Sequence, residues 1–290
     1  MPKILITGSS GNVGRATVEW LLRLDKKQTF RLGLRRPDKA SQEYGEEKRL
    51  ERVTFDFTDP STHQAALRNI EYVFLLRPPK LANVDKQFLP FLEEAQKSGI
   101  KGMVFLSVQG AEKISNLPHA RIEKLIRKLE LPFVFLRAGY FMQNLTTTLY
   151  ADIKANGEVT LPAGRAKFSW VDVDNLGEVA ARTLLEFDGY QNQAFTLTGP
   201  QNLNFSDAIA VINQTLSTDL KYRPTNVFSY WYHLRKQKLS WIQIFILTLI
   251  HLTPRFAPSP PPTRKYTEIT GKDPTTLAEF AKREENKFSR

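Results

Sequence analysis

Residues Lys3–Leu22 read KILITGSSGNVGRATVEWLL and set a pattern that much of this 290-residue chain repeats. The apolar run KILITG predicts a buried strand, and apolar residues at helical spacing follow directly after three glycines. In such a turn the first glycine permits the tight bend, the second lets a pyrophosphate approach the backbone, and the third lets the helix pack closely. The start of the helix also offers unpaired N–H groups to an anion. We therefore expect a phosphate-binding turn formed by Gly8, Ser9, Ser10, Gly11, Asn12, Val13 and Gly14.

Five further strand-like runs continue the pattern and alternate with helical segments up to about the middle of the chain. Unbroken apolar strands separated by helices predict βαβ units and a parallel sheet that is covered on both faces. The expected fold class is therefore α/β, a Rossmann-type doubly wound sheet. The further strands are expected at 29–35, 52–57, 72–76, 102–108 and 132–139, and the later helices at 63–70, 84–99 and 119–131. Ser61 or Thr62 is expected to cap the helix at 63–70, and Gly99 to end the helix at 84–99.

The alternation weakens after Asn144, and the C-terminal third is helical and aromatic. A helix is expected at 171–187, with Asp172 and Asp174 available as caps, then a strand at 193–199 and a helix at 204–216 capped by Ser206. We therefore expect two lobes. Residues 1–150, with 171–199 returning, form the dinucleotide-binding domain; 151–170 and 200–290 form a smaller, mostly helical substrate lobe or lid.

Composition limits the class of protein. The absence of cysteine removes disulfides, zinc–thiolate sites and thiol nucleophiles. With no signal-peptide pattern at the N-terminus, we expect a cytoplasmic protein. A homodimer is one assembly that the sequence leaves open. The net charge of +11 fits a solvated basic surface, attraction of an anionic cofactor or substrate, or a nucleic-acid or membrane partner. Because the basic residues are dispersed without an interleaved aromatic stripe, no nucleic acid is expected.

Two C-terminal stretches stand out. Trp241–Leu252, WIQIFILTLIHL, is too short to span a bilayer, which takes about 20 residues. A buried helix is the favoured interpretation, with contact at a membrane surface as the alternative. The proline-rich stretch Ala257–Lys265 is expected to be an extended connector.

The end of the second predicted strand indicates which dinucleotide binds. NAD sites place an acidic residue there to hold the ribose 2′-hydroxyl, but this chain has LGLRRPDK. The guanidinium groups of Arg35 and Arg36 match a 2′-phosphate. Solvated surface arginines are the alternative. NADP(H) is the expected cofactor, and no metal site is expected.

Several segments in order carry a family resemblance. LITGSSGNVG is similar to the TGxxGxxG fingerprint of extended and atypical short-chain dehydrogenases. FDFTDPSTHQAALRNIEYVFLLRPP, HARIEKLIRKLELPFVFLRAGYFMQNL, WVDVDNLGEVAARTL and TEITGKDPTTLAEFAK resemble the NmrA-like branch of that superfamily, which includes type-two quinone reductases and triphenylmethane reductases. The resemblance covers nearly the whole chain. It implies that Asp56 and Phe57 line the adenine pocket, and that Leu76, Arg77, Pro78 and Ser107 lie beside the nicotinamide ribose. Simple packing is an equal alternative for Leu76 and Pro78.

The usual catalytic tyrosine of short-chain dehydrogenases has no counterpart here. The corresponding region reads ISNLPHARIE, so the common alcohol–ketone mechanism, which needs the Tyr-x-x-x-Lys pair, is disfavoured. The resemblance then implies one of two functions. One is NADP(H)-dependent reduction of a small planar conjugated acceptor such as a quinone or enone; the other is non-catalytic sensing of the dinucleotide. The residues expected nearest the chemistry are His119, Gln109, Tyr140, Phe141 and Asn144, with a surface position for His119 and a core position for Tyr140 and Phe141 as the alternatives.

Overall fold

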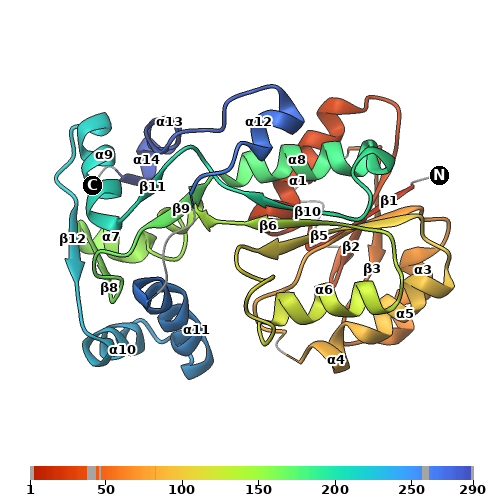
Figure 1. Cartoon of the computed structure of the whole chain (residues 1–290), viewed down its shortest axis with the longest axis horizontal. Coiled ribbons are helices and arrows are strands. Elements are labelled where there is room, and N and C mark those ends of the chain that lie inside the picture. Colours follow the sequence, from red (N-terminus) through yellow and green to blue (C-terminus); the bar gives the residue numbers. More distant parts are fainter. Residues whose placement is uncertain (1–2, 38–43, 46, 82, 257–260, 289–290) are drawn as a thin grey trace. The chain divides into compact units, whose positions relative to one another are not determined.

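Seven parallel strands form a sheet in the order β10-β6-β5-β4-β1-β2-β3 (Figure 1). The computed structural model describes residues 3–37, 44–45, 47–81, 83–256 and 261–288. Within the sheet β1 pairs with both β2 and β4, so the strand order reverses beside β1. The predicted α/β doubly wound fold is therefore confirmed. The strands are β1 (Ile4–Thr7), β2 (Phe30–Leu34), β3 (Leu50–Thr54), β4 (Tyr72–Leu75), β5 (Gly102–Val108), β6 (Phe133–Ala138) and β10 (Gln193–Leu197).

The chain divides into two compact units. The first comprises Met1–Ala138, Val173–Leu197 and Lys265–Gly271, and contains this sheet. The second comprises Gly139–Asp172, Thr198–Arg264 and Lys272–Arg290.

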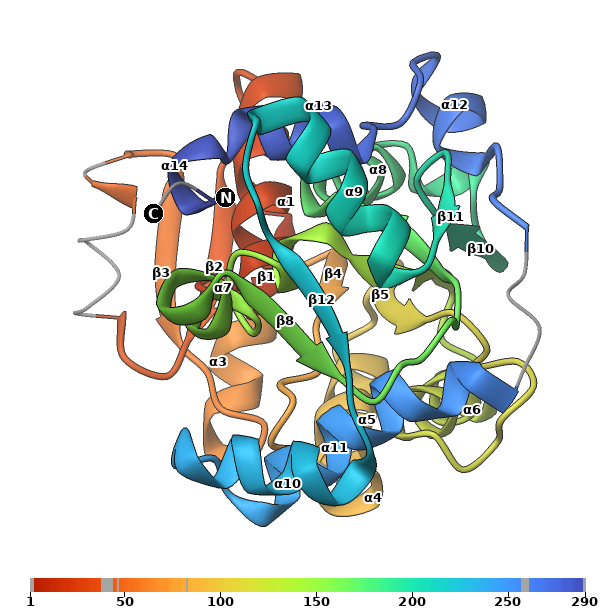
Figure 2. The same cartoon turned by 90° about the vertical axis from the view of Figure 1, so that its left-hand side faces the viewer.

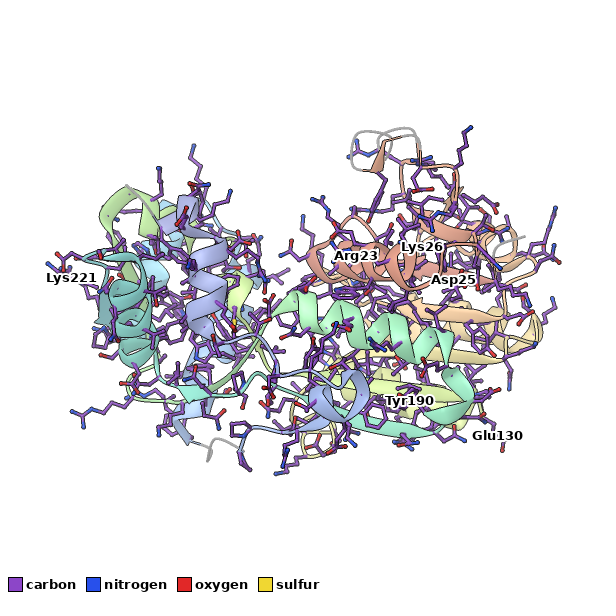
Figure 3. All side chains as sticks on the ribbon, turned by 90° about the horizontal axis from the view of Figure 1, so that it is seen from above. Arg23, Asp25, Lys26, Glu130, Tyr190 and Lys221 are labelled. Atoms are coloured by element: carbon purple, nitrogen blue, oxygen red, sulfur yellow. The ribbon has the colours of Figure 1, made fainter. Side chains whose placement is uncertain are left out.

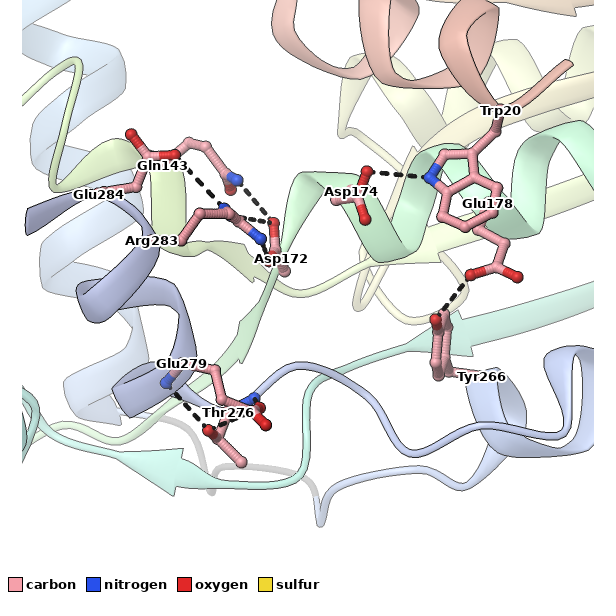
Figure 4. A network of polar contacts seen from close by, with 10 residues as sticks. All are labelled: Trp20, Gln143, Asp172, Asp174, Glu178, Tyr266, Thr276, Glu279, Arg283 and Glu284. Atoms are coloured by element: carbon pink, nitrogen blue, oxygen red, sulfur yellow. Dashed lines mark hydrogen bonds and ion pairs between the residues drawn. The ribbon is translucent and has the colours of Figure 1, made fainter. Parts of the chain in front are cut away.

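Helices cover both faces of the sheet (Figure 1). On one face α1 (Asn12–Leu24) packs against α8 (Val173–Leu185), where a Cβ on Gly177 would lie 2.6 Å from the Ala16 side chain. The indole of Trp20 also donates a hydrogen bond to Asp174 at 2.9 Å, which joins the two helices (Figure 4). The remaining helical elements of this unit are η2 (Pro60–Thr62), α3 (His63–Leu67), α4 (Val84–Gln87), α5 (Leu89–Lys97), α6 (Pro118–Lys128), η4 (Phe187–Gly189) and α12 (Lys265–Thr270).

Several local details differ from the expectations. The expected helix at 84–99 is broken at Phe88, because Pro90 has no N–H to donate at the start of α5. The third strand begins and ends before the expected 52–57, and Thr62 precedes α3 without a side-chain cap. The turn before α3 is instead held by Asp59, whose carboxylate accepts the N–H of Ser61. Gly99 follows α5 with a φ of +68°, as expected for a residue after the helix end.

The second unit contains two small sheets and an aromatic core. β9 (Phe168–Val171) pairs with β11 (Asn202–Leu203) and β7 (Tyr140–Phe141), while β8 (Glu158–Leu161) pairs with β12 (Lys221–Pro224). Asn204, rather than the expected Ser206, caps α9, since its side chain accepts the N–H of Asp207. The helical elements are η3 (Met142–Asn144), α7 (Tyr150–Asn156), α9 (Phe205–Leu216), α10 (Val227–Lys236), α11 (Trp241–Leu252), η5 (Thr253–Phe256), α13 (Leu277–Arg283) and α14 (Glu285–Phe288).

The preference for a buried helix at 241–252 is wrong. The segment is helical, but only Ile244, Thr248 and His251 are buried, and five of its large apolar side chains are exposed. Among the described residues, no helix is both long and apolar enough to cross a membrane. In the stretch expected to be an extended connector, residues 257–260 lie outside the described ranges.

Candidate functional site: a phosphate-binding turn

The glycine turn between β1 and α1 has the geometry of an anion cradle. Gly8 adopts a φ of +63°, a conformation that L side chains rarely adopt, and its carbonyl accepts the N–H of Gly11 at 3.0 Å. A Cβ on Gly14 would lie 2.2 Å from the Gly8 carbonyl oxygen. The third glycine is therefore required for α1 to start this close to the strand.

The start of α1 is free to receive a negative charge. Gly11 is the N-cap and contributes no side-chain hydrogen bond, and the first turn carries no acidic residue. The Ser9 hydroxyl is buried and has no hydrogen-bond partner among the described residues. An unpaired buried hydroxyl next to unpaired helical N–H groups fits a phosphate, which accepts hydrogen bonds from both. The outer residues of the turn, Ser10 and Asn12, are exposed.

The loop after β4 forms the second side of the turn. The Thr7 hydroxyl donates to the Phe74 carbonyl at 3.0 Å and accepts the Leu76 N–H at 2.9 Å, which ties the ends of β1 and β4 together. The Leu76 side chain lies against Gly8, where an added Cβ would meet it at 3.0 Å. Leu76 therefore packs directly on the turn at the position where the strand order reverses, which is where ligands of open α/β sheets bind.

The end of β2 brings two cations to the same edge of the sheet. Arg35 and Arg36 directly follow β2, whose Gly33 pairs with Thr7 of β1. Both side chains are exposed, and neither forms an ion pair with a described carboxylate. A guanidinium that is not already paired can bind an incoming phosphate in a bidentate manner.

The two residues expected at the adenine have different environments. The Asp56 carboxylate accepts the backbone N–H of Thr58 at 2.8 Å and its hydroxyl at 2.7 Å, and its side chain is half-buried. Phe57 is buried in an aromatic cluster, with its ring centre 4.6 Å from that of Phe88. The structure thus places Phe57 in the hydrophobic core beneath the turn that holds Asp56.

His119 and Arg77, which are far apart in the sequence, meet beyond the sheet. His119 is the second residue of α6, and its Nε2 receives the Arg77 Nε–H at 3.4 Å. A guanidinium only donates, so this nitrogen of His119 is the acceptor and the ring is neutral. Burial and the nearby Arg77 charge lower the pKa of His119 to about 3. The Arg77 side chain is held in turn by the Leu81 carbonyl, 2.7 Å from its Nη1, and Pro78 lies half-buried beside it.

Sequence reasoning missed the polar group that surrounds Ser107 at the end of β5. Glu123 is buried on α6 and accepts the Ser107 hydroxyl at 2.6 Å. Arg137 on β6 donates to both oxygens of the same carboxylate, at 3.0 and 2.6 Å. These contacts raise the pKa of Arg137, chiefly through the hydrogen bond to Glu123. Glu123 stands four residues after His119, so the helical repeat alone would have placed both on one face of α6.

Gln109, the residue after β5, is held through its backbone N–H, which donates to the Ala138 carbonyl at 2.9 Å. It therefore follows Ser107 at the same edge of the sheet.

The remaining expected site residues belong to the second unit. Tyr140 lies among Phe168, Trp170 and Phe205, and its hydroxyl is 2.9 Å from Nε2 of His251. Burial raises the pKa of Tyr140 well above its usual value. Phe141 and Asn144 follow in β7 and η3 and are half-buried.

His251 determines the direction of the hydrogen bond from Tyr140. Its Nδ1 is 2.8 Å from the Leu247 carbonyl, which can only accept, so Nδ1 carries the proton. Nε2 then accepts from the Tyr140 hydroxyl. Burial lowers the pKa of His251 to about 4, so the ring is neutral near neutral pH.

A separate hollow of about 400 Å³ lies at the opposite edge of the sheet. Tyr72 at the start of β4 and residues 185–190, including Tyr190, line it. Because the glycine turn lies at the carboxyl ends of the parallel strands, this hollow is not part of the phosphate-binding site.

Known proteins share this architecture. Prestalk A differentiation protein A of Dictyostelium discoideum is 30% identical over 96% of this chain and 91% of its own length. The Citrobacter sp. triphenylmethane reductase complexed with NADP(H) superimposes with a TM-score of 0.86 at 19% identity, covering 97% of this chain and 99% of that one. The Escherichia coli NADPH-dependent quinone oxidoreductase complexed with NADPH gives a TM-score of 0.84 at 19% identity, covering 97% of this chain and 99% of that one. The NmrA-like family model matches residues 2–231, and the chain therefore belongs to the NmrA-like family.

Proposed function

We propose that this protein is an NADP(H)-dependent oxidoreductase that reduces a planar conjugated acceptor such as a quinone or enone. The observation that carries the proposal is the glycine turn, where an unpaired buried Ser9 hydroxyl lies next to an uncapped helix start. This pairing is suited to a pyrophosphate rather than to a purely structural turn.

Different residues of the first unit would bind different parts of the cofactor. The N–H groups at the start of α1 and the Ser9 hydroxyl would bind the pyrophosphate. The Leu76 side chain would pack against Gly8 of the turn. Arg35 and Arg36 would bind the 2′-phosphate, which selects NADP(H) over NAD(H). When bound, the reduced nicotinamide supplies a hydride.

The polar groups of the first unit favour an acceptor that needs little acid catalysis. His119 is neutral because its pKa is lowered to about 3, and the Ser107 hydroxyl is already donated to Glu123. Neither group is poised to protonate an alkoxide as it forms. A quinone or enone spreads the negative charge that it gains, so that orientation of the acceptor can supply most of the rate enhancement.

The two similar structures support the same class of acceptor, since one is named a quinone oxidoreductase and the other a triphenylmethane reductase. We assign dinucleotide binding to the first unit and acceptor binding to the second. Phe141 is the first residue of the second unit to test, because its partly exposed ring can contact a planar acceptor.

The test combines cofactor binding with turnover. NADPH affinity is measured by calorimetry, and NADPH oxidation is followed by absorbance with a panel of quinones, enones and dyes. Tight NADPH binding with turnover of at least one conjugated acceptor, and a lower rate for Phe141→Ala, is the expected result. Tight binding without turnover of any acceptor would favour a dinucleotide-sensing protein, and no binding at all would refute the cofactor assignment.

A further inference from the structure

The exposed large apolar side chains are concentrated on one segment of the second unit. Ten such side chains are exposed among the described residues, and eight of them lie between Phe228 and Phe256. Scattered exposed apolar residues are ordinary, but a concentrated group marks an interaction surface. The eight are Phe228, Tyr232, Trp241, Ile242, Phe245, Leu249, Ile250 and Phe256.

Helix α11 reverses the usual orientation of an amphipathic helix. Its polar residues Thr248 and His251 are buried, whereas Ile242 and Phe245 are 69% and 60% exposed. The helix contains no charged Lys, Arg, Asp or Glu residue. A surface helix of a globular protein normally directs its polar face to water, so the outer face of α11 is suited to an apolar environment.

The packing of α11 is specific. Ser240 and Gln243 form a capping box at its start. Helix α10 lies beside it, with the Trp231 indole donating to Thr248 at 3.0 Å (Figure 1 and Figure 2). The apolar face is therefore held by a defined pair of helices and does not result from a frayed terminus.

The same segment is basic. Phe228–Phe256 contains four Lys or Arg and no Asp or Glu, a formal charge of +4 within the chain total of +11. On α10 and its C-terminal turn, Arg235, Lys236 and Lys238 are exposed and form no ion pair with a described carboxylate. Arg235 and Lys236 lie over the rings of Trp241 and Tyr232 at 5.3 and 4.7 Å.

We propose that the surface formed by α10, α11 and η5 docks onto an anionic lipid bilayer. Exposed aromatic and aliphatic side chains bordered by unpaired cations are the features by which a helix lies in the plane of a membrane interface. Its apolar face then enters the boundary between headgroups and acyl chains by about 5–10 Å. The cations then bind the lipid phosphates, so that the exposed apolar side chains and the positive charges both contribute to binding at one surface.

Charge disfavours a second copy of this chain as the partner of the surface. A two-fold dimer would place the same patch on both subunits and would bring two copies of Arg235, Lys236 and Lys238 into one interface. A bilayer containing acidic lipids presents the opposite charge over a broad area.

Vesicle flotation tests the proposal with the full-length protein. We expect it to float with vesicles of phosphatidylglycerol and phosphatidylcholine at low salt, and to bind phosphatidylcholine alone much more weakly. Lys236→Gln with Lys238→Gln should weaken binding about thirtyfold, since each cation near an anionic lipid surface strengthens binding about fivefold. Ile242→Glu with Phe245→Glu should abolish it.

The controls make the same kinds of change on the first unit. Lys26→Gln with Lys27→Gln removes two exposed cations, of which Lys26 is labelled in Figure 3. Ile114→Glu places a charge at a side chain that is 54% exposed. Both controls should bind vesicles as the unchanged protein does, and circular dichroism should show that every variant is folded. Failure of the unchanged protein to float with anionic vesicles would overturn the proposal. So would light scattering that shows a dimer dissociated by Ile242→Glu with Phe245→Glu, without any vesicle binding.

Discussion

Substitution of Gly11 by valine separates the phosphate-binding role of the turn from its role in the fold. Gly11 has a φ of −88° and a ψ of 167°, an extended conformation that valine adopts readily. A Cβ there would lie 3.4 Å from the Gly8 carbonyl oxygen, which is ordinary contact. We therefore expect a folded Gly11→Val protein whose two extra methyl groups occupy the space in front of the helix start.

The expected loss of affinity follows from the hydrogen bonds that the side chain would block. A hydrogen bond to a charged group contributes about 1.5–3 kcal/mol, so losing two would cost about 3–6 kcal/mol. This corresponds to a rise in the NADPH dissociation constant of roughly a hundredfold to ten-thousandfold. Calorimetric titration of NADPH measures the loss, and thermal unfolding verifies the fold.

Two other glycine substitutions complete the experiment. Gly189→Val lies in η4, where an added Cβ meets no atom within 4 Å, and it should change neither binding nor stability. Gly14→Ala should destabilise the fold itself, because its Cβ would lie 2.2 Å from the Gly8 carbonyl oxygen. Unchanged NADPH affinity in folded Gly11→Val would refute the phosphate-binding role.

Three further predictions concern other parts of the first and second units. Replacing Arg35 and Arg36 with serine should weaken NADPH binding by about 2–4 kcal/mol while changing NADH binding little; equal losses by calorimetry would show that they do not bind the 2′-phosphate. Glu123→Gln should lower the free energy of unfolding by about 3 kcal/mol, since it leaves the partly buried Arg137 guanidinium with only the more exposed Glu112 as a charge partner, whereas Glu112→Gln should cost less than about 1 kcal/mol in the same urea titration. Because the pKa of His251 is about 4 in the folded chain and 6.5 in the unfolded one, the unfolded state takes up the proton first as pH falls, and this site should lower stability by about 2 kcal/mol from pH 7 to pH 5. His251→Gln should therefore flatten the measured pH dependence of unfolding, and an unchanged slope would contradict a neutral buried imidazole.

Local patterns in the sequence were sufficient for the sheet and its glycine turn. The spacing of Gly8, Gly11 and Gly14 between an apolar strand and a helix depends on backbone geometry within a few residues, so it can be recognised without tertiary information. Alternating strands and helices likewise implied parallel pairing. Strands and helices in this order have few other arrangements in which the apolar faces of both are buried. The position of Arg35 and Arg36 beside the glycine turn followed from the same reasoning. They directly follow the second strand, and the carboxyl ends of parallel strands lie at the same edge of the sheet.

Side-chain partners that are distant in sequence were determined only by the tertiary structure. Ser107 and Arg137 meet Glu123 because β5, β6 and α6 come together in space, and no local pattern specifies that pairing. The outward face of α11 is a second example: helical periodicity would direct its few polar residues to water, but Thr248 and His251 are buried. Burial is a property of the neighbours that a segment finds, and for α11 those neighbours come from other parts of the second unit.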